Sequence, residues 1–151
     1  MLKINNHLEL LRLGNNNIIC ESLKILTDGI AGNSSIKVLY INWNLIWDNG
    51  ACYFFEMLEK NSSIETLYMD LNKIGDKGGH GLAKCISKNS KLSLIYINDN
   101  EIKDFVKISH ALEGNKVIIS LYIYNNHLTN EIKKLVKKKH YDWILVNSTL
   151  Y

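Results

Sequence analysis

Two stretches of the chain, NSSIKVLYINWNLI (residues 33–46) and NSSIETLYMDLNKI (residues 61–74), match at nearly every apolar position. The match extends along the chain as the pattern LxxLxLxxNxI/L, in which an asparagine stands three positions beyond a pair of aliphatic residues. Five copies begin at Leu8, Ile36, Ile64, Leu92 and Ile118, so the period is constant over the first four copies and slightly shorter before the fifth. Self-similarity at such a period indicates a repeat architecture.

The second half of each copy has the spacing of a helix. Apolar residues recur there at i, i+3, i+4 and i+7, which is the pattern of an amphipathic α-helix. Helices are predicted near residues 23–30, 51–58, 79–86, 105–112 and 132–136. An asparagine follows each of the first four helices, and we expect left-handed backbone at Gly32-Asn33, Asn61, Asn89 and Gly114-Asn115, as is common where a helix ends. Each repeat is therefore one strand, one turn and one helix.

Stacking explains how such units fold. A single strand and helix cannot bury its apolar face alone, but units in register align their aliphatic residues into a continuous core. Strands in a sheet lie about 4.8 Å apart whereas packed helices need roughly 8–10 Å, so the stack bends with the sheet inside. We expect the asparagines of the pattern to bond the loops of their own and the next repeat. They are Asn16, Asn44, Asn72, Asn100 and Asn126.

The repeats resemble the leucine-rich repeats of the ribonuclease-inhibitor-like class, which also occur in NOD-like receptors and Ran GTPase-activating proteins. The resemblance covers about residues 5–139 and implies an α/β fold, a leucine-rich repeat solenoid shaped as a short horseshoe, with a parallel β-sheet on the concave face and α-helices on the convex face. We predict one domain over residues 1–151, with strands starting near residues 8, 36, 64, 92 and 118, a last strand at Trp143–Val146 and an irregular C-terminal cap at 141–151. Met1–Asn5 aligns with the helix end Gly29–Asn33, so a longer array stays open.

The concave face carries the residues that the core does not use. The middle residue of each LxL segment points to that face by simple alternation, and this column reads Arg12, Tyr40, Tyr68, Tyr96 and Tyr122. The next columns add Trp43, Asp70, Asp99 and Tyr124. Aromatic side chains beside small polar groups are favoured at protein-binding hot spots, so we predict that these nine residues bind a partner. The alternative is that tyrosine suits exposed strand positions and only stabilises the sheet.

Composition argues against several other functions. Of the 18 basic residues only Arg12 is an arginine and the net charge is +3, so no specific nucleic-acid partner is expected. Cys20, Cys52 and Cys85 have no metal-ligand or disulfide spacing, and the histidines share no column with them, so we expect no metal, no cofactor and no catalytic activity. The chain start lacks a signal peptide and no window is apolar enough to span a membrane, which favours an intracellular, cytoplasmic protein without membrane insertion.

Three further features have simple interpretations. The stretch GDKGGHG at Gly75–Gly81 lacks the order of a phosphate-binding loop and is predicted to be a flexible turn into a helix on the convex side. The run KKLVKKKH at residues 133–140 is either the solvated face of the last helix or a docking patch for an acidic partner. The first strand, around Leu8–Leu13, has no preceding repeat, so its edge is a candidate for self-association.

The function predicted from these observations is a non-catalytic protein–protein interaction module that binds a protein partner on its concave face. Two alternatives stay open. One is a regulator of the Ran GTPase-activating class, and the other is a structural subunit of a larger assembly. The matching positions of the repeats are structural, so the sequence does not identify the partner.

Overall fold

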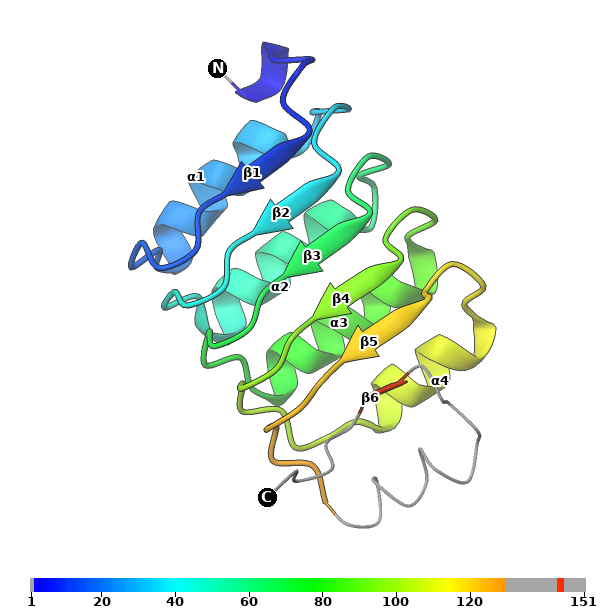
Figure 1. Ribbon diagram of the computed structural model, residues 1–151. Coiled ribbons are helices and arrows are strands. Elements are labelled where there is room, and N and C mark those ends of the chain that lie inside the picture. Colours follow the sequence, from blue (N-terminus) through cyan, green and yellow to red (C-terminus); the bar gives the residue numbers. More distant parts are fainter. Residues whose placement is uncertain (1, 130–143, 146–151) are drawn as a thin grey trace.

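The computed structural model describes residues 2–129 and 144–145 (Figure 1). Short strands alternate with helices along this part of the chain. The strands are β1 (Leu10–Arg12), β2 (Val38–Tyr40), β3 (Thr66–Tyr68), β4 (Leu94–Tyr96), β5 (Ser120–Tyr122) and β6 (Ile144–Leu145). The helices are the 3-10 turn η1 (Leu2–Ile4) and the α-helices α1 (Cys20–Ile30), α2 (Trp47–Leu58), α3 (Asp76–Lys88) and α4 (Val106–Gly114). The first four predicted helices are therefore present.

The strands form one parallel sheet in sequence order, with the α-helices packed on one of its faces (Figure 1). The pairing keeps the repeat register, so that Leu11 lies opposite Leu39, and Leu39 opposite Leu67. β6 lies within the predicted last strand. The predicted fifth helix at 132–136, the lysine run at 133–139 and the rest of the cap at 141–151 lie outside the described residues.

Each strand begins two positions later than the pattern indicated, because an asparagine turns the chain before it. The Oδ1 atom of Asn33 accepts the backbone N–H of Ile36 (2.8 Å), and Asn61 accepts that of Ile64 (2.9 Å). The same turn recurs at Asn5, Asn89 and Asn115. The prediction of left-handed backbone at these helix ends was wrong, since none of the four asparagines named there has a positive φ. Their side chains, rather than their backbone, redirect the chain.

Left-handed residues occur instead in the turn that follows each of the first five strands. They hold one fixed position of the repeat and are Asn15, Trp43, Leu71, Asp99 and Asn125, with φ between 49° and 58°. A left-handed conformation costs an ordinary residue roughly 1–2 kcal/mol. The architecture therefore imposes this conformation, because the chain adopts it even with tryptophan or leucine at the position.

The core lies between the sheet and the helices, and its repeats are joined by an asparagine ladder formed by Asn44, Asn72, Asn100 and Asn126. Nδ2 of Asn44 donates to the carbonyls of Leu13 in the preceding repeat and Ile41 in its own, both at 3.0 Å. Its Oδ1 accepts the N–H groups of Asn16 (3.0 Å) and Ile18 (2.8 Å). The predicted links between loops are thus present, but each asparagine reaches its own and the preceding repeat.

Asn72 departs from this pattern. Its Oδ1 is the one buried side-chain polar atom in the described residues that has no hydrogen-bond partner. The cause is an irregular turn in the preceding repeat. Repeats 1 and 3 have a second left-handed residue directly after the asparagine, Asn17 (φ 52°) and Lys73 (φ 57°), whereas repeat 2 has it at Trp47 (φ 55°) and not at Leu45. The N–H of Trp47 then donates to the backbone carbonyl of Asn72 at 3.0 Å.

A second set of links joins the beginnings of the helices. Oδ1 of Asp48 accepts the N–H groups of Gly75 (2.9 Å) and Gly78 (2.7 Å), so a carboxylate from one repeat caps α3 of the next. Asp76 holds the same place against the turn before α4, with distances of 2.6 and 2.8 Å. Negative charge at a helix N-terminus is stabilising. Cys20 occupies the corresponding position of repeat 1.

The prediction of a flexible turn at Gly75–Gly81 was wrong, because α3 already begins at Asp76. Gly78 is buried, and a Cβ atom there would lie 2.9 Å from Oδ1 of Asp48 and 3.2 Å from Cβ of Ala51. The glycine therefore permits close packing of α3 against α2.

No helix in the described part of the chain is long and apolar enough to cross a membrane.

Candidate functional site

Four tyrosines on adjacent strands form a continuous stack across the sheet, here called the tyrosine ladder: Tyr40, Tyr68, Tyr96 and Tyr122. Successive ring centroids lie 4.1, 4.3 and 4.2 Å apart, with interplanar angles of 3°, 12° and 5°. All four side chains are half-buried. The rings therefore hold one another in place. The packing of tyrosines across neighbouring strands, which the sequence analysis gave as the alternative to partner binding, is thus present.

Both ends of the ladder are covered. The guanidinium carbon of Arg12 lies 4.8 Å from the ring centroid of Tyr40. At the other end Tyr124 packs at a tilt against Tyr122, with ring centroids 6.2 Å apart. Because the ring faces are covered by neighbours, the ladder offers a partner mainly ring edges and hydroxyl groups.

The hydroxyls of Tyr68 and Tyr96, in the middle of the ladder, are protonated at neutral pH. Burial raises the pKa of Tyr68 above its ordinary value, and a hydrogen bond with Tyr40 raises it further. Burial also raises the pKa of Tyr96. The hydroxyls of Tyr68 and Tyr96 can therefore each donate one hydrogen bond and accept others.

A polar column runs beside the ladder. Oδ1 of Asp70 accepts both the N–H and the Nδ2 group of Asn98, at 2.8 and 2.7 Å. Oδ1 of Asn98 in turn accepts the N–H of Tyr124 at 2.8 Å, and Asp99 accepts Nδ2 of Asn125 at 2.9 Å. Burial raises the pKa of Asp70 above its ordinary value. Asn98 thus links Asp70 to Tyr124, and the backbone N–H of Asp99 donates to the carbonyl of Tyr124 at 2.8 Å.

Two tryptophans are exposed beyond the C-terminal end of β2, Trp43 in the turn and Trp47 at the beginning of α2. Trp43 is 58% exposed and follows β2, while Trp47 is 49% exposed and packs against Lys73, whose Nζ lies 4.7 Å from the ring centroid. The sequence prediction included Trp43 and missed Trp47. In the sequence, Trp47 stands out because it interrupts the repeat: the corresponding position of repeat 3 is Gly75.

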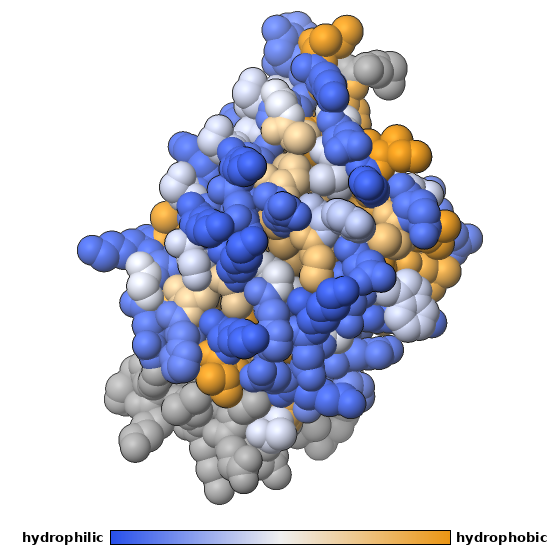
Figure 2. Space-filling view, turned by 180° about the vertical axis from the view of Figure 1, so that it is seen from behind, coloured by the Kyte–Doolittle hydropathy of each residue, from blue (hydrophilic) through white to orange (hydrophobic). Residues whose placement is uncertain are grey.

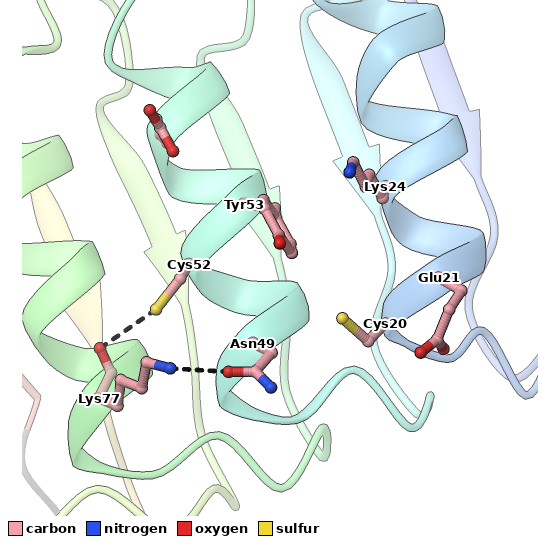
Figure 3. Close-up of a pocket in the computed structure, with 8 residues that line it drawn as sticks. Cys20, Glu21, Lys24, Asn49, Cys52, Tyr53 and Lys77 are labelled. Carbon is pink, nitrogen blue, oxygen red and sulfur yellow. Dashed lines mark hydrogen bonds between the residues drawn. The ribbon is translucent and has the colours of Figure 1, made fainter.

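The opposite, helical face is largely hydrophilic (Figure 2). On this face a hollow of about 570 Å³ lies between α1 and the beginnings of α2 and α3 and is lined by Cys20, Lys24, Cys52 and Tyr53 among others (Figure 3). Burial raises the pKa of the Cys52 thiol, whose Sγ lies 3.5 Å from the carbonyl oxygen of Lys77. Among the described residues, no histidine lines this hollow.

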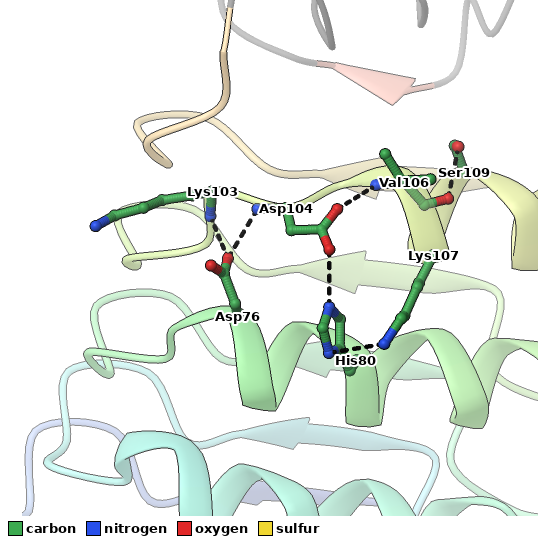
Figure 4. Close-up of polar contacts among 7 residues, drawn as sticks. All are labelled: Asp76, His80, Lys103, Asp104, Val106, Lys107 and Ser109. Carbon is green, nitrogen blue, oxygen red and sulfur yellow. Dashed lines mark hydrogen bonds and ion pairs between the residues drawn. The ribbon is translucent and has the colours of Figure 1, made fainter.

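One histidine makes a polar cluster between α3 and α4 (Figure 4). Nε2 of His80 lies 3.0 Å from Oδ2 of Asp104, and its Nδ1 lies 3.2 Å from Nζ of Lys107. The one hydroxyl in this cluster, Oγ of Ser109, donates to the backbone carbonyl of Val106 (2.8 Å). The cluster therefore joins α3 to the beginning of α4. No group of three or more metal-ligating side chains occurs in residues 2–129 and 144–145.

The sequence matches no protein-family model and no curated protein. Among solved structures, this chain is similar to leiomodin-1 actin-binding site 2, with a TM-score of 0.75, 18% sequence identity, and coverage of 91% of this chain and 82% of that one. It also matches an internalin C2 from Listeria monocytogenes, more weakly, at a TM-score of 0.48 and 16% identity, over 92% of this chain and 80% of that one. The fold is a leucine-rich repeat solenoid.

Proposed function

We propose that the protein is a non-catalytic interaction module and that it binds a protein partner on the exposed face of the sheet. The observation that carries this proposal is the tyrosine ladder, in which four stacked rings present their edges and hydroxyls side by side. The predicted binding residues Arg12, Trp43, Asp70, Asp99 and Tyr124 surround it. The length of the helices, 9 to 13 residues in the described repeats, supports the ribonuclease-inhibitor-like class.

Rigidity is the physical advantage of such a surface. Ordering a flexible side chain at an interface costs about 0.5–1.5 kcal/mol. The ladder rings are already held by their neighbours at 4.1–4.3 Å, so little of this cost remains when a partner binds. Tyrosine also combines apolar area with a hydroxyl, which is why it is enriched at hot spots.

The fold comparison supports binding in general terms. The leiomodin-1 domain with the same fold is an actin-binding site by its own description. At 18% identity that likeness extends to the fold, so it supports an interaction role without naming actin as the partner here.

The test compares two alanine variants that remove tyrosines from opposite faces. The double variant Tyr68→Ala with Tyr96→Ala breaks the ladder at its middle, whereas Tyr53→Ala removes a 45% exposed tyrosine from the helical face. A hot-spot ring contributes roughly 2 kcal/mol or more, so the double variant should weaken a partner complex at least about a hundredfold, at ~1.4 kcal/mol per factor of ten. The readout is capture of proteins from a cell lysate by each variant, followed by the dissociation constant of the captured partner.

A third variant separates binding from folding. Each lost cross-strand stack destabilises the sheet by roughly 0.2–1 kcal/mol, so the alanine pair should also lower the thermal midpoint. Tyr68→Phe with Tyr96→Phe keeps the stack and removes the two hydroxyls, so it should keep the midpoint and still weaken binding about tenfold or more. The proposal is wrong if the tyrosine pairs bind like wild type while Tyr53→Ala loses the partner.

A further inference from the structure

The tyrosine ladder separates two unlike columns on the exposed face of the sheet. Positions two residues before and two residues after each ladder tyrosine lie on the same face as the tyrosine, because side chains alternate along a strand. The preceding column is mainly aliphatic and the following column is polar: Val38, Thr66 and Leu94 against Asn42, Asp70 and Asn98. All six residues are partly exposed. A partner that lies along the ladder therefore meets an apolar side and a polar side.

The middle of this face is negatively charged. In the first five repeats, the three columns of the face and the turn position that follows them hold three charged residues, Arg12, Asp70 and Asp99. Arg12 covers one end of the ladder, whereas the two carboxylates follow the central rungs Tyr68 and Tyr96. The whole chain has a net charge of +3, so the negative charge is a local property of this surface. Charge complementarity favours a basic partner here.

Asp70 has hydrogen-bonding capacity that the described part of the chain does not use. Its Oδ1 accepts both bonds from Asn98, while Oδ2 accepts none from another described residue. Neither Asp70 nor Asp99 forms an ion pair within that part of the chain. Burial raises the pKa of Asp70, and the nearby charge of Asp99 raises it further. A cation supplied from outside would stabilise the ionised form of Asp70.

An exposed indole lies at the same edge of the sheet. Trp43 donates its backbone N–H to the carbonyl of Asp70 at 2.9 Å, so the turn of repeat 2 lies directly beside Asp70. The Trp43 side chain is 58% exposed. Indole attracts cations more strongly than the other aromatic rings, and lysine and arginine also pack their methylene stems on apolar surface. The pairing of an indole with a carboxylate thus suits a basic side chain.

We infer, resting on the function proposed above, that the partner is a basic protein segment that lies along the ladder and places a lysine or arginine beside Asp70 and Asp99. A partner that covers the central rungs also takes water away from Asp70, and a buried carboxylate without a cation or donor is costly. A basic side chain removes this cost through a charge-assisted hydrogen bond, whereas a neutral apolar or acidic segment does not. Apolar side chains of the same segment cover Val38 and Leu94 on the other side.

The first test uses a library of random peptides displayed on phage and selected on the full chain. Wild type should enrich peptides that carry lysine or arginine and that lose binding to Tyr68→Ala with Tyr96→Ala. Selection on Asp70→Asn with Asp99→Asn should no longer enrich basic residues. Ladder-dependent peptides without this enrichment overturn the inference and leave the proposed function standing. If no selected peptide depends on the ladder, both are wrong.

The affinity of one selected peptide tests the pairing directly. Asp70→Asn keeps an oxygen that accepts from Asn98 and removes the charge, so it should weaken this peptide about tenfold or more. Replacing the basic residue of the peptide by glutamine should have the same effect, and both changes together should weaken binding no more than either alone. Effects that multiply would show that the two groups do not meet, and the inference would be wrong.

Two further variants separate pairing from folding and from net charge. Asp99→Asn changes an exposed side chain in a turn and leaves the Asp70–Asn98 bonds in place, so it should keep the thermal midpoint and weaken the peptide roughly two- to fivefold. The matched control Asp28→Asn removes an exposed carboxylate from α1 and changes the net charge equally, so it should bind like wild type. A control that loses as much affinity as Asp70→Asn would overturn the inference.

Discussion

Replacing Asn100 by alanine should destabilise the protein far more than replacing Asn72, although both hold the same position in successive repeats. Asn100 accepts the backbone N–H groups of Asn72 and Ile74, both at 3.0 Å, and both groups are buried. Asn72 accepts no hydrogen bond through its side chain, because the turn before it is irregular. The two substitutions remove the same atoms, so their difference isolates the hydrogen bonds.

The magnitude follows from which groups lose their last partner. Asn100→Ala leaves two buried N–H groups without an acceptor, at about 1–3 kcal/mol each, for a total of about 2–6 kcal/mol. The carbonyls that bond Asn72 or Asn100 each keep a second donor, so neither substitution leaves a carbonyl unpaired. Asn72→Ala also removes an unpaired buried acceptor, and we expect a cost of about 1 kcal/mol or less.

Thermal unfolding followed by circular dichroism measures both effects. A change of 1 kcal/mol shifts the midpoint of a protein of this size by roughly 2–4 °C, so Asn100→Ala should lower it by on the order of 10 °C and Asn72→Ala by a few degrees at most. Equal losses in the two variants would refute the reasoning, since they would mean that Oδ1 of Asn72 is as well bonded in solution as Oδ1 of Asn100.

Three other outcomes test separate parts of the structure. Gly78→Ala should destabilise the protein by about 1–3 kcal/mol, because the new methyl group would clash with Cγ2 of Ile74 and crowd the packed face of α2. Gly81→Ala, whose Cβ would find ordinary contacts of 3.5 Å, should instead stabilise α3 by about 0.5–1 kcal/mol in urea unfolding. The hydrogen bond from His80 lowers the pKa of Asp104 from its ordinary 3.8. The ionised Asp104 carboxylate therefore stabilises the folded protein above that pH, and this stabilisation is lost as the pH falls through the lowered pKa. Asp104→Asn should thus be less stable than wild type at neutral pH and equally stable when unfolding is measured at strongly acidic pH. Burial raises the pKa of Cys85 to about 12, so alkylation followed by mass spectrometry should leave it unmodified until the protein is unfolded.

The repeat pattern was sufficient to predict the sheet and the stack of side chains on it. A constant period places equal positions of successive strands side by side, so the column Tyr40, Tyr68, Tyr96 and Tyr122 could be read from spacing alone. The ring distances confirm that these residues meet. Their role in binding stays a prediction.

Hydrogen bonds of side chains to the backbone were harder to predict. The asparagines at the helix ends suggested left-handed backbone because glycine and asparagine both adopt it, yet Asn33 and Asn61 act through their side-chain oxygens. The carboxylates of Asp48 and Asp76 also recur one repeat period apart. Their partners are N–H groups of the next repeat, and a pattern of side chains does not show which backbone groups lack a partner.

Stability and binding are coupled at the tyrosine ladder. In a repeat array each unit contacts only its neighbours, so the stability of the whole is close to a sum of unit and junction terms. The ladder contributes one ring stack to each of three successive junctions. A partner that contacts several rungs at once binds only when those junctions are formed, and therefore strengthens them by mass action. The same rings that hold adjacent repeats in register are thus the ones whose exposed edges a partner would contact. The alanine pair at Tyr68 and Tyr96 therefore changes both stability and binding, whereas the phenylalanine pair keeps the stack and tests binding alone.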